Sequence, residues 1–328
     1  ISTFAKADIK YHPNDYGVVA IMYHRFNENK YPSTNIKIDI FKKQLELIEE
    51  NNIEYYDPAK FDNEYYIPKK NHKILITIDD AFLSFYENAW PILKKKKIPF
   101  ILFVSTEPVG KSGYMNWEQI KEVSSHDFAY IGNHSHTHEY LLNFSHSEFE
   151  KDIKNSIELF KDKLGYNPIF FSYPFGEYNL KQTQYIKNNF KYGFGQHSGV
   201  IDSTKNRFEL PRFPINEKYG DLERFKFISK LFPIPYKNLN PEDKFISKKQ
   251  NPPTIKINFF EEQKYIKNIN CFSNEGNEWR NPIMEFKEKS FEINFREKFT
   301  FRRGRVNCSV QDANIWRWLG IQMSVEVD

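Results

Sequence analysis

Short apolar runs alternate with amphipathic segments from about residue 18 to residue 232, and this alternation is typical of parallel β/α units. The apolar runs predict strands at 18–23, 74–78, 100–104, 128–131 and 169–173, with a weaker strand at 192–194. Helical spacing between them predicts a helix that Asp39 would cap, and further helices over 84–97 and 147–164. The pattern leaves two folds open, a barrel and an open sheet.

The pattern changes near Pro233. Two polar, proline-containing stretches, 238–243 and 248–253, are typical of a linker. The short alternating runs that follow, at 255–259, 283–286, 291–295, 305–310 and 319–325, predict a small all-β sandwich. We therefore divide the chain into an N-terminal segment (1–15), a β/α domain (16–235), a linker (236–254) and a β-sandwich domain (255–328).

Charge and composition narrow the classes of partner. The net charge of +4 comes from evenly mixed charges, so nothing indicates nucleic-acid binding. No stretch approaches the roughly 20 apolar residues of a membrane span. Ala5-Lys6-Ala7 resembles the end of a secretory signal, and Cys271 and Cys308 could form a disulfide or stay as separate buried thiols. We expect a secreted or periplasmic protein, of unknown oligomeric state.

Polar residues follow the predicted strands at one end. Asp79 and Asp80 close the run 74–78, and His134 and His138 lie just past the run 128–131. Active sites of parallel β/α folds gather beyond the carboxyl ends of the strands. One carboxylate and two imidazoles can hold a divalent metal and leave a position open for water. The sequence therefore predicts metal-assisted hydrolysis.

Three motifs in this order, Thr77-Ile78-Asp79-Asp80, His134-Ser135-His136-Thr137-His138 and Tyr173-Pro174-Phe175-Gly176, resemble those of the polysaccharide deacetylase (NodB-homology) family. The resemblance covers roughly residues 16 to 215. It implies an α/β fold, a distorted (β/α) barrel of about seven strands. It also implies hydrolysis of N- or O-acetyl groups of a polysaccharide with a divalent metal, commonly zinc. The run Met22-Tyr23-His24-Arg25-Phe26 is similar to the first strand of members that act on exported glucosamine polymers.

The resemblance also assigns roles. Asp79 matches the catalytic base, Asp80, His134 and His138 match the metal ligands, and His197 matches the general acid. His136 is interpreted as a neighbouring or surface residue, and His126 and His146 as solvated. His24 could pack under the site or touch substrate, and a structural role is favoured.

The third motif implies a wall of the substrate groove formed by Tyr173, Pro174 and Phe175, with the Phe175 N–H at the oxyanion. Ser172 departs from the family pattern, because many members have there an Arg that orients the base. Members acting on poly-N-acetylglucosamine often lack that Arg. We hypothesise that Arg212 supplies the missing positive charge. Arg212 is also expected to be one of the substrate-binding residues. On this reading Arg212→Ala costs more in kcat than in folding.

The function expected is metal-dependent removal of N-acetyl groups from an N-acetylglucosamine-containing polysaccharide. Two alternatives stay open, a non-catalytic carbohydrate-binding or matrix protein and an O-acetyl esterase. The β-sandwich domain has two interpretations as well. Aromatic and basic side chains of this domain would suit a sugar surface or a plain packing role: Trp279, Trp316, Trp318, Arg302, Arg303 and Arg305.

Overall fold

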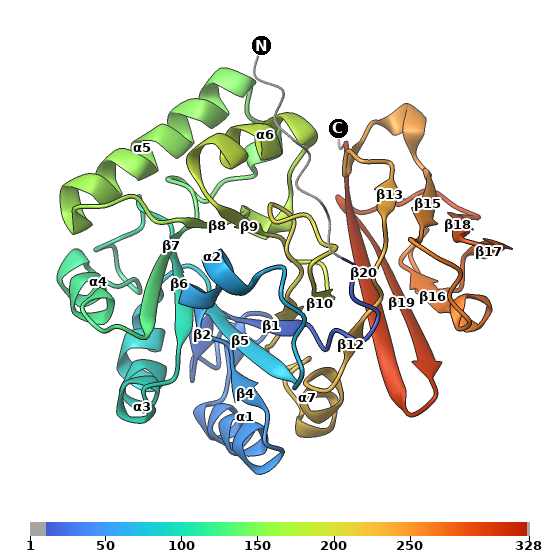
Figure 1. Cartoon of the computed structure of the whole chain (residues 1–328). Coiled ribbons are helices and arrows are strands. Elements are labelled where there is room, and N and C mark those ends of the chain that lie inside the picture. Colours follow the sequence, from blue (N-terminus) through green and yellow to red (C-terminus); the bar gives the residue numbers. More distant parts are fainter. Residues whose placement is uncertain (1–10, 327–328) are drawn as a thin grey trace.

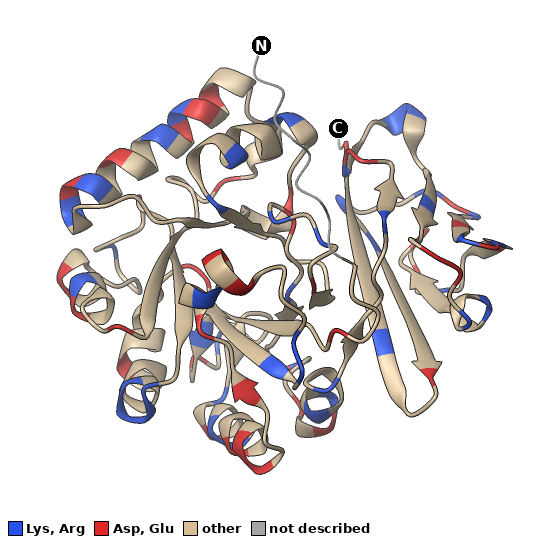
Figure 2. Ribbon diagram, in the orientation of Figure 1, with Lys and Arg blue, Asp and Glu red and all other residues tan. Residues whose placement is uncertain are grey.

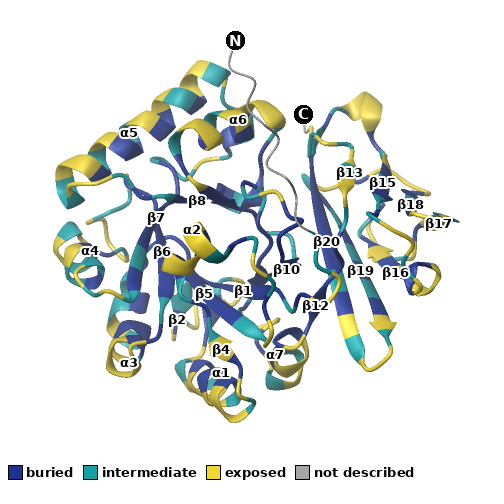
Figure 3. Cartoon of the chain, in the orientation of Figure 1, coloured by how far each residue is buried: buried dark blue, intermediate teal, exposed yellow. Residues whose placement is uncertain are grey.

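The computed structural model describes residues 11–326, which form a β/α barrel followed by a smaller β domain (Figure 1). The triplet Ala5-Lys6-Ala7 lies outside the described residues. The long strands of the barrel are buried and the outer faces of the helices are exposed (Figure 3), while Lys, Arg, Asp and Glu are interspersed over those faces (Figure 2). Among the described residues, no helix has the length and apolar character needed to span a bilayer.

The barrel is built on a nine-stranded sheet whose main path runs β10-β1-β5-β6-β7-β8-β9, with β11 paired to β1 and β4 paired to β5. Its strands are β1 (Val18–Tyr23), β4 (Glu54–Tyr55), β5 (Lys73–Ile78), β6 (Phe100–Val104), β7 (Ala129–Asn133), β8 (Phe170–Ser172), β9 (Tyr192–Phe194), β10 (Val200–Ile201) and β11 (Phe213–Pro214). A separate small ribbon pairs β2 (Arg25–Phe26) with β3 (Asn35–Ile36).

Helices cover the outside of this sheet (Figure 1). They are α1 (Ile38–Glu50), α2 (Phe61–Glu64), α3 (Trp90–Lys96), α4 (Trp117–Ser124), α5 (His146–Leu164), α6 (Leu180–Asn189) and α7 (Leu222–Ile228). The longest, α5, starts at a capping box of Ser145 and Glu148 and ends at Gly165, whose φ of 82° suits glycine. At α1 the predicted cap is wrong, because Lys37 occupies the N-cap and Asp39 lies in the first turn.

The six predicted barrel strands all form, and the fold is the expected distorted barrel rather than a flat open sheet. Strands β5 to β9 are parallel neighbours in sequence order. Residues 207–214 then close the barrel, because they bond to β9 through the Gly193 and Gly195 N–H groups and continue into β11 beside β1. Closure brings the carboxyl ends of β1, β5, β7, β8 and β9 to one rim.

The C-terminal domain is a sandwich of two sheets. One sheet contains β12 (Phe232–Pro233), β14 (Phe245–Ile246), β16 (Asn270–Ser273), β19 (Arg303–Asp312) and β20 (Ile315–Val325). The other contains β13 (Asn238–Asn240), β15 (Thr254–Asn258), β17 (Ile283–Lys287) and β18 (Ser290–Asn294). Buried side chains of both sheets form a single apolar core.

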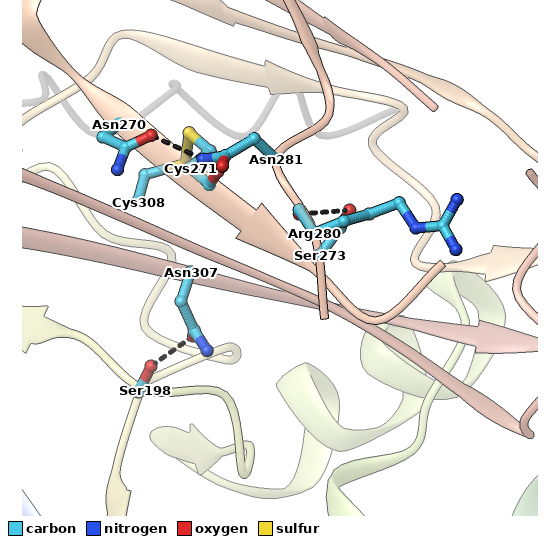
Figure 4. Close-up of a disulfide and its surroundings, with 8 residues drawn as sticks. All are labelled: Ser198, Asn270, Cys271, Ser273, Arg280, Asn281, Asn307 and Cys308. Carbon is cyan, nitrogen blue, oxygen red and sulfur yellow. Dashed lines mark hydrogen bonds between the residues drawn. A yellow bond between two sulfur atoms is a disulfide. The ribbon is translucent and has the colours of Figure 1, made fainter. Parts of the chain in front are cut away.

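Two features of this domain resolve or correct sequence expectations. Cys271 and Cys308 lie opposite each other on β16 and β19 and form a disulfide (Figure 4). The stretch expected to be a linker belongs to the sandwich instead, because β13 pairs with β15 and β14 pairs with β20. Its polar composition suits edge strands as well as it suits a linker.

Candidate metal centre and active site

The polar residues predicted at the strand ends meet at the rim of the barrel. Asp79 and Asp80 directly follow β5, and His134 directly follows β7. His24 directly follows β1, and the Asp79 N–H donates to the Tyr23 carbonyl over 2.9 Å. The parallel register of β1 and β5 therefore sets the first histidine beside the two carboxylates.

Asp80, His134 and His138 form a set of possible metal ligands. Their nearest ligand atoms all lie within 4.8 Å of one another. The Asp80 Oδ1 atom is 3.0 Å from His138 Nε2 and 3.5 Å from His134 Nε2. Within the described part of the chain, the buried Asp80 Oδ1 and His134 Nε2 atoms have no hydrogen-bond partner. Buried polar atoms rarely stay unpaired, and one carboxylate with two imidazoles suits a divalent cation, so these residues fit the metal that the motifs imply.

The pKa shifts of His134 and Asp80 agree with this assignment. His134 Nδ1 lies 2.7 Å from the Ser172 carbonyl oxygen and donates its proton there, which leaves the Nε2 lone pair facing Asp80. Burial lowers the pKa of His134 to about 4, so the ring is neutral at pH 7. Burial would also lower the pKa of His138, but the Asp80 carboxylate outweighs it and raises that pKa. Burial would raise the pKa of Asp80, yet the neighbouring imidazoles lower it on balance.

A buried carboxylate of helix α5 holds the histidine loop. Asp152 accepts hydrogen bonds from the His136 N–H (2.8 Å), the Thr137 N–H (3.1 Å) and the Thr137 hydroxyl (2.7 Å). His136 Nδ1 lies 2.8 Å from Thr106 Oγ1, and His136 is not among the ligand set. The sequence analysis missed Asp152, although its place on the apolar stripe of α5, three residues after Phe149, was a signal for a buried polar anchor.

Left-handed backbone conformations gather around the site. Five non-glycine residues of the site loops have positive φ: Asp80 (74°), Ala81 (53°), Ser135 (69°), His138 (56°) and Phe175 (59°). Such conformations cost energy for residues with a Cβ, and they persist where the surroundings fix them. Four of the five are ligands or direct neighbours of ligands, which indicates that the loops are shaped by the site.

Arg212 occupies the place for which the sequence hypothesis proposed it. Its guanidinium donates to both Asp79 oxygens, over 2.6 and 2.8 Å, and to the Ser172 hydroxyl over 2.7 Å. Its remaining N–H groups donate to Thr77 Oγ1 (3.1 Å) and to the Gly195 carbonyl (2.9 Å). All five donors are thus used, and the side chain is 0% exposed. The expectation that Arg212 binds substrate is therefore wrong, because no donor faces outward.

This ion pair also sets the charge of Asp79. Burial would raise the pKa of the Asp79 carboxyl, but Arg212 and then His134 more than compensate and lower it. Asp79 is consequently ionised at neutral pH and fixed in orientation. Ser172, which departs from the family pattern, accepts from the same guanidinium. The positive charge beside Asp79 therefore comes from the residue that precedes β11 and not from β8.

The structure brings His24, and not His197, to the two carboxylates. His24 Nε2 is 4.0 Å from Asp79 Oδ2, and His134 Nε2 is 3.8 Å from the same oxygen. Within residues 11–326, no hydrogen bond or ion pair joins the His197 side chain to the site. Burial, followed by Lys244, Lys205 and Arg212, lowers the pKa of His197 to about 3. A glycine-rich loop leaves the side-chain direction of His197 open, and here its ring lies against Gly195 instead.

The third motif is placed partly as expected. Tyr173 and Pro174 are buried, and the Tyr173 ring packs against Phe171 and Tyr178, so neither residue offers its side chain to a substrate. The Phe175 ring lies 4.9 Å from the His138 ring and stacks on Tyr140 at 4.1 Å.

One backbone donor of the same motif has no acceptor among residues 11–326. The loop's own backbone hydrogen bonds use the Gly176 and Glu177 N–H groups, and no hydrogen bond of the described residues uses the Phe175 N–H. This N–H therefore remains the candidate oxyanion donor, whereas the substrate-binding expectation for the Tyr173 and Pro174 side chains is corrected.

A sequence profile of the polysaccharide deacetylase family matches residues 67–193, a range that includes both carboxylates, both imidazole ligands and the third motif. This barrel therefore resembles those of the polysaccharide deacetylase family. A poly-β-1,6-N-acetyl-D-glucosamine N-deacetylase of Staphylococcus aureus is similar, with 26% identity over 195 residues. The alignment covers 54% of this chain and 66% of that protein.

Solved structures share the fold of the deacetylase barrel. Streptococcus pyogenes deacetylase PplD, in complex with acetate, superposes with a TM-score of 0.57 at 23% identity, over 62% of this chain and 95% of that chain. IcaB from Ammonifex degensii superposes with a TM-score of 0.58 at 24% identity, over 66% of this chain and 97% of that chain. Both matched chains are covered almost fully, so the likeness concerns the barrel.

Proposed function

We propose that this protein removes N-acetyl groups from an N-acetylglucosamine-containing polysaccharide with the help of a divalent metal, zinc being the cation that the donor set suits. The observation that carries the proposal is the juxtaposition of Asp79, ion-paired to Arg212, with the ligand set of Asp80, His134 and His138. The staphylococcal relative, whose name specifies poly-β-1,6-N-acetyl-D-glucosamine, supports the substrate class.

The reaction adds the oxygen of a water molecule to the acetyl carbon, breaks the carbon–nitrogen bond, and releases acetate and an amine. When bound, the cation would polarise the acetyl carbonyl and make a water molecule more acidic. Asp79 takes the proton of the attacking water, and Arg212 keeps its carboxylate in one orientation. The Phe175 N–H donates to the oxygen that becomes negative in the tetrahedral intermediate.

The departing nitrogen needs a proton, and His24 is the imidazole placed to give it. Its Nε2 is within 4.0 Å of Asp79, its side chain is 15% exposed, and it does not belong to the ligand set. The His197 side chain has no hydrogen bond or ion pair with the site within the described residues, although its backbone carbonyl accepts from the Arg212 N–H, and its lowered pKa leaves the ring neutral at pH 7. We therefore transfer the role of general acid from His197 to His24.

We also propose that the protein works outside the cytoplasm. The Cys271–Cys308 disulfide supports this, because disulfides persist in oxidising compartments.

The test is release of acetate from acetylated glycans by purified protein. A poly-β-1,6-N-acetylglucosamine oligomer, a chitin oligomer, peptidoglycan and an acetylated xylan would be compared. We expect release from at least one N-acetylated substrate, loss of release with a chelator, and recovery with zinc. Release from acetylated xylan alone would identify an O-acetyl esterase, and no release from any substrate would refute the proposal.

A further inference from the structure

A glutamine of the C-terminal domain is bonded to the backbone of the candidate oxyanion loop. Gln322, on β20, donates its side-chain N–H to the Phe175 carbonyl (3.3 Å) and the Gly176 carbonyl (2.9 Å). Its side-chain oxygen accepts from Arg305 Nε over 3.3 Å, and the residue is 5% exposed. The two domains are thus joined by hydrogen bonds at the peptide groups next to the proposed catalytic N–H.

These carbonyls lie in a part of the loop that needs external support. Phe175 has a φ of 59°, a conformation that costs energy for any residue with a Cβ. Gly176, with a φ of 68°, has no room for a side chain, because a Cβ there would lie 2.6 Å from the Gln196 backbone nitrogen. A loop in this conformation is held by its neighbours rather than by its own preferences.

Arg302, the residue that precedes β19, contacts the same loop. It donates to Glu177 Oε2 over 2.6 Å and to Asn143 Oδ1 over 3.0 Å. Its guanidinium also lies 4.3 Å from the centre of the Tyr140 ring, and Tyr140 stacks on Phe175. Glu177 is 1% exposed, so its ion pair with Arg302 is a buried link between the loop and the sandwich.

A third contact fixes the strands themselves against the barrel. The Ser198 hydroxyl donates to Asn307 Oδ1 on β19 over 2.8 Å (Figure 4) and accepts from Trp318 Nε1 on β20 over 2.8 Å. At Gly320 a Cβ would lie 2.1 Å from the Ser198 carbonyl oxygen, so the two backbones touch. The β19–β20 hairpin is therefore seated on the barrel rim and cannot shift without disturbing the loops it contacts.

From these contacts we infer that the β19–β20 hairpin contributes to the active site. Gln322 and Arg302 are positioning residues that hold the Phe175 N–H in place. The C-terminal domain then raises kcat by holding the Phe175 N–H in place. The competing role for the same domain is binding of the polymer, which would change the affinity for substrate instead of kcat. The inference rests on the proposed function, because it concerns the rate of the same hydrolysis.

The test compares Gln322→Leu with wild type on a soluble oligomer that the enzyme deacetylates. The loss of the donor to two loop carbonyls should lower kcat about fivefold, which is the rate equivalent of one neutral hydrogen bond. KM should change little. Zinc affinity, measured by titration, should stay at the wild-type value because no ligand is altered. Hydrogen–deuterium exchange of a peptide covering 173–178 should become faster.

Gln311→Leu is the matched control. Gln311 is an exposed residue of β19, so this substitution is the same chemical change on the same hairpin. Arg302→Lys should fall between wild type and Arg302→Met in kcat, because lysine keeps the charge that faces Glu177. The inference is overturned if Gln322→Leu keeps the wild-type kcat and exchange rate, or if KM alone rises, which would indicate polymer capture. If wild type itself releases no acetate, the proposed function fails, whereas the exchange comparison still tests whether Gln322 holds the loop.

Discussion

Replacing Arg212 tests the central ion pair of the site, and its effect can be estimated from the structure. Asp79 and Arg212 are both 0% exposed, and the guanidinium uses every donor it has. Removing one partner of a buried pair costs about 3–5 kcal/mol, because the other charge remains buried without compensation. For a domain of this size that corresponds to a fall in Tm of roughly 6–20 °C. Arg212→Ala is therefore expected to carry a large folding cost beside the larger loss in kcat that the sequence predicts.

Arg212→Lys separates positioning from stability. Lysine keeps the charge but cannot make the paired contacts to both Asp79 oxygens, so the carboxylate loses its fixed orientation. We expect kcat to fall about 100-fold, the cost of a misplaced catalytic group. The assay is acetate release at a temperature where calorimetry shows the variant to be folded.

The buried pair Asp202–Lys205 provides the control for this experiment. Its atoms are 3.0 Å apart, its side chains are 2% and 4% exposed, and it lies outside the proposed catalytic set. Lys205→Met should lower the Tm comparably while the folded enzyme keeps its kcat. An Arg212→Lys variant with the kcat of wild type, or a Lys205→Met variant that loses kcat as strongly, would refute a positioning role for Arg212.

Three further predictions follow from the site and the sandwich. His24→Ala should lower kcat at least about 100-fold, the usual contribution of a general acid, while His197→Ala should change it only a few-fold; equal losses would contradict the reassignment. Asp152→Ala should weaken zinc binding about 10- to 100-fold in a competition titration, because the histidine loop loses its anchor, and an unchanged affinity would disprove that role. Replacing Cys271 and Cys308 by Ser should lower the free energy of unfolding of the sandwich by about 2–4 kcal/mol, as measured by calorimetry. An unfolding temperature equal to that of wild type would contradict a stabilising role for the disulfide.

The barrel could be predicted from the sequence because its strands carry an unambiguous signal. Runs such as Ile74-Leu75-Ile76-Thr77-Ile78 are buried on both faces in the structure, so their apolar pattern has a single interpretation. The sandwich was harder to delimit. Strands β13 and β14 contain only three and two residues. They adopt strand conformation because they pair with strands distant in the sequence, and not because of a local β preference. Such strands are not visible in a pattern of apolar positions.

The residues of the candidate site also differ in how well the sequence predicts them. Residues that directly follow a strand could be placed, whereas residues in a loop could not. Asp79, Asp80 and His134 directly follow long strands, and their positions could be predicted because a strand fixes where its next residue lies. His24 follows β1 under the same rule, and applying that rule evenly would have grouped it with the carboxylates. His197 follows β9 by three residues in a loop with glycine on both sides, where backbone freedom leaves the side-chain direction undetermined. A motif match gave this residue a catalytic role that its geometry does not support. The proposal that His24 is the general acid therefore rests on its place at the end of a strand, whereas the role expected for His197 rested on a motif in a glycine-containing loop.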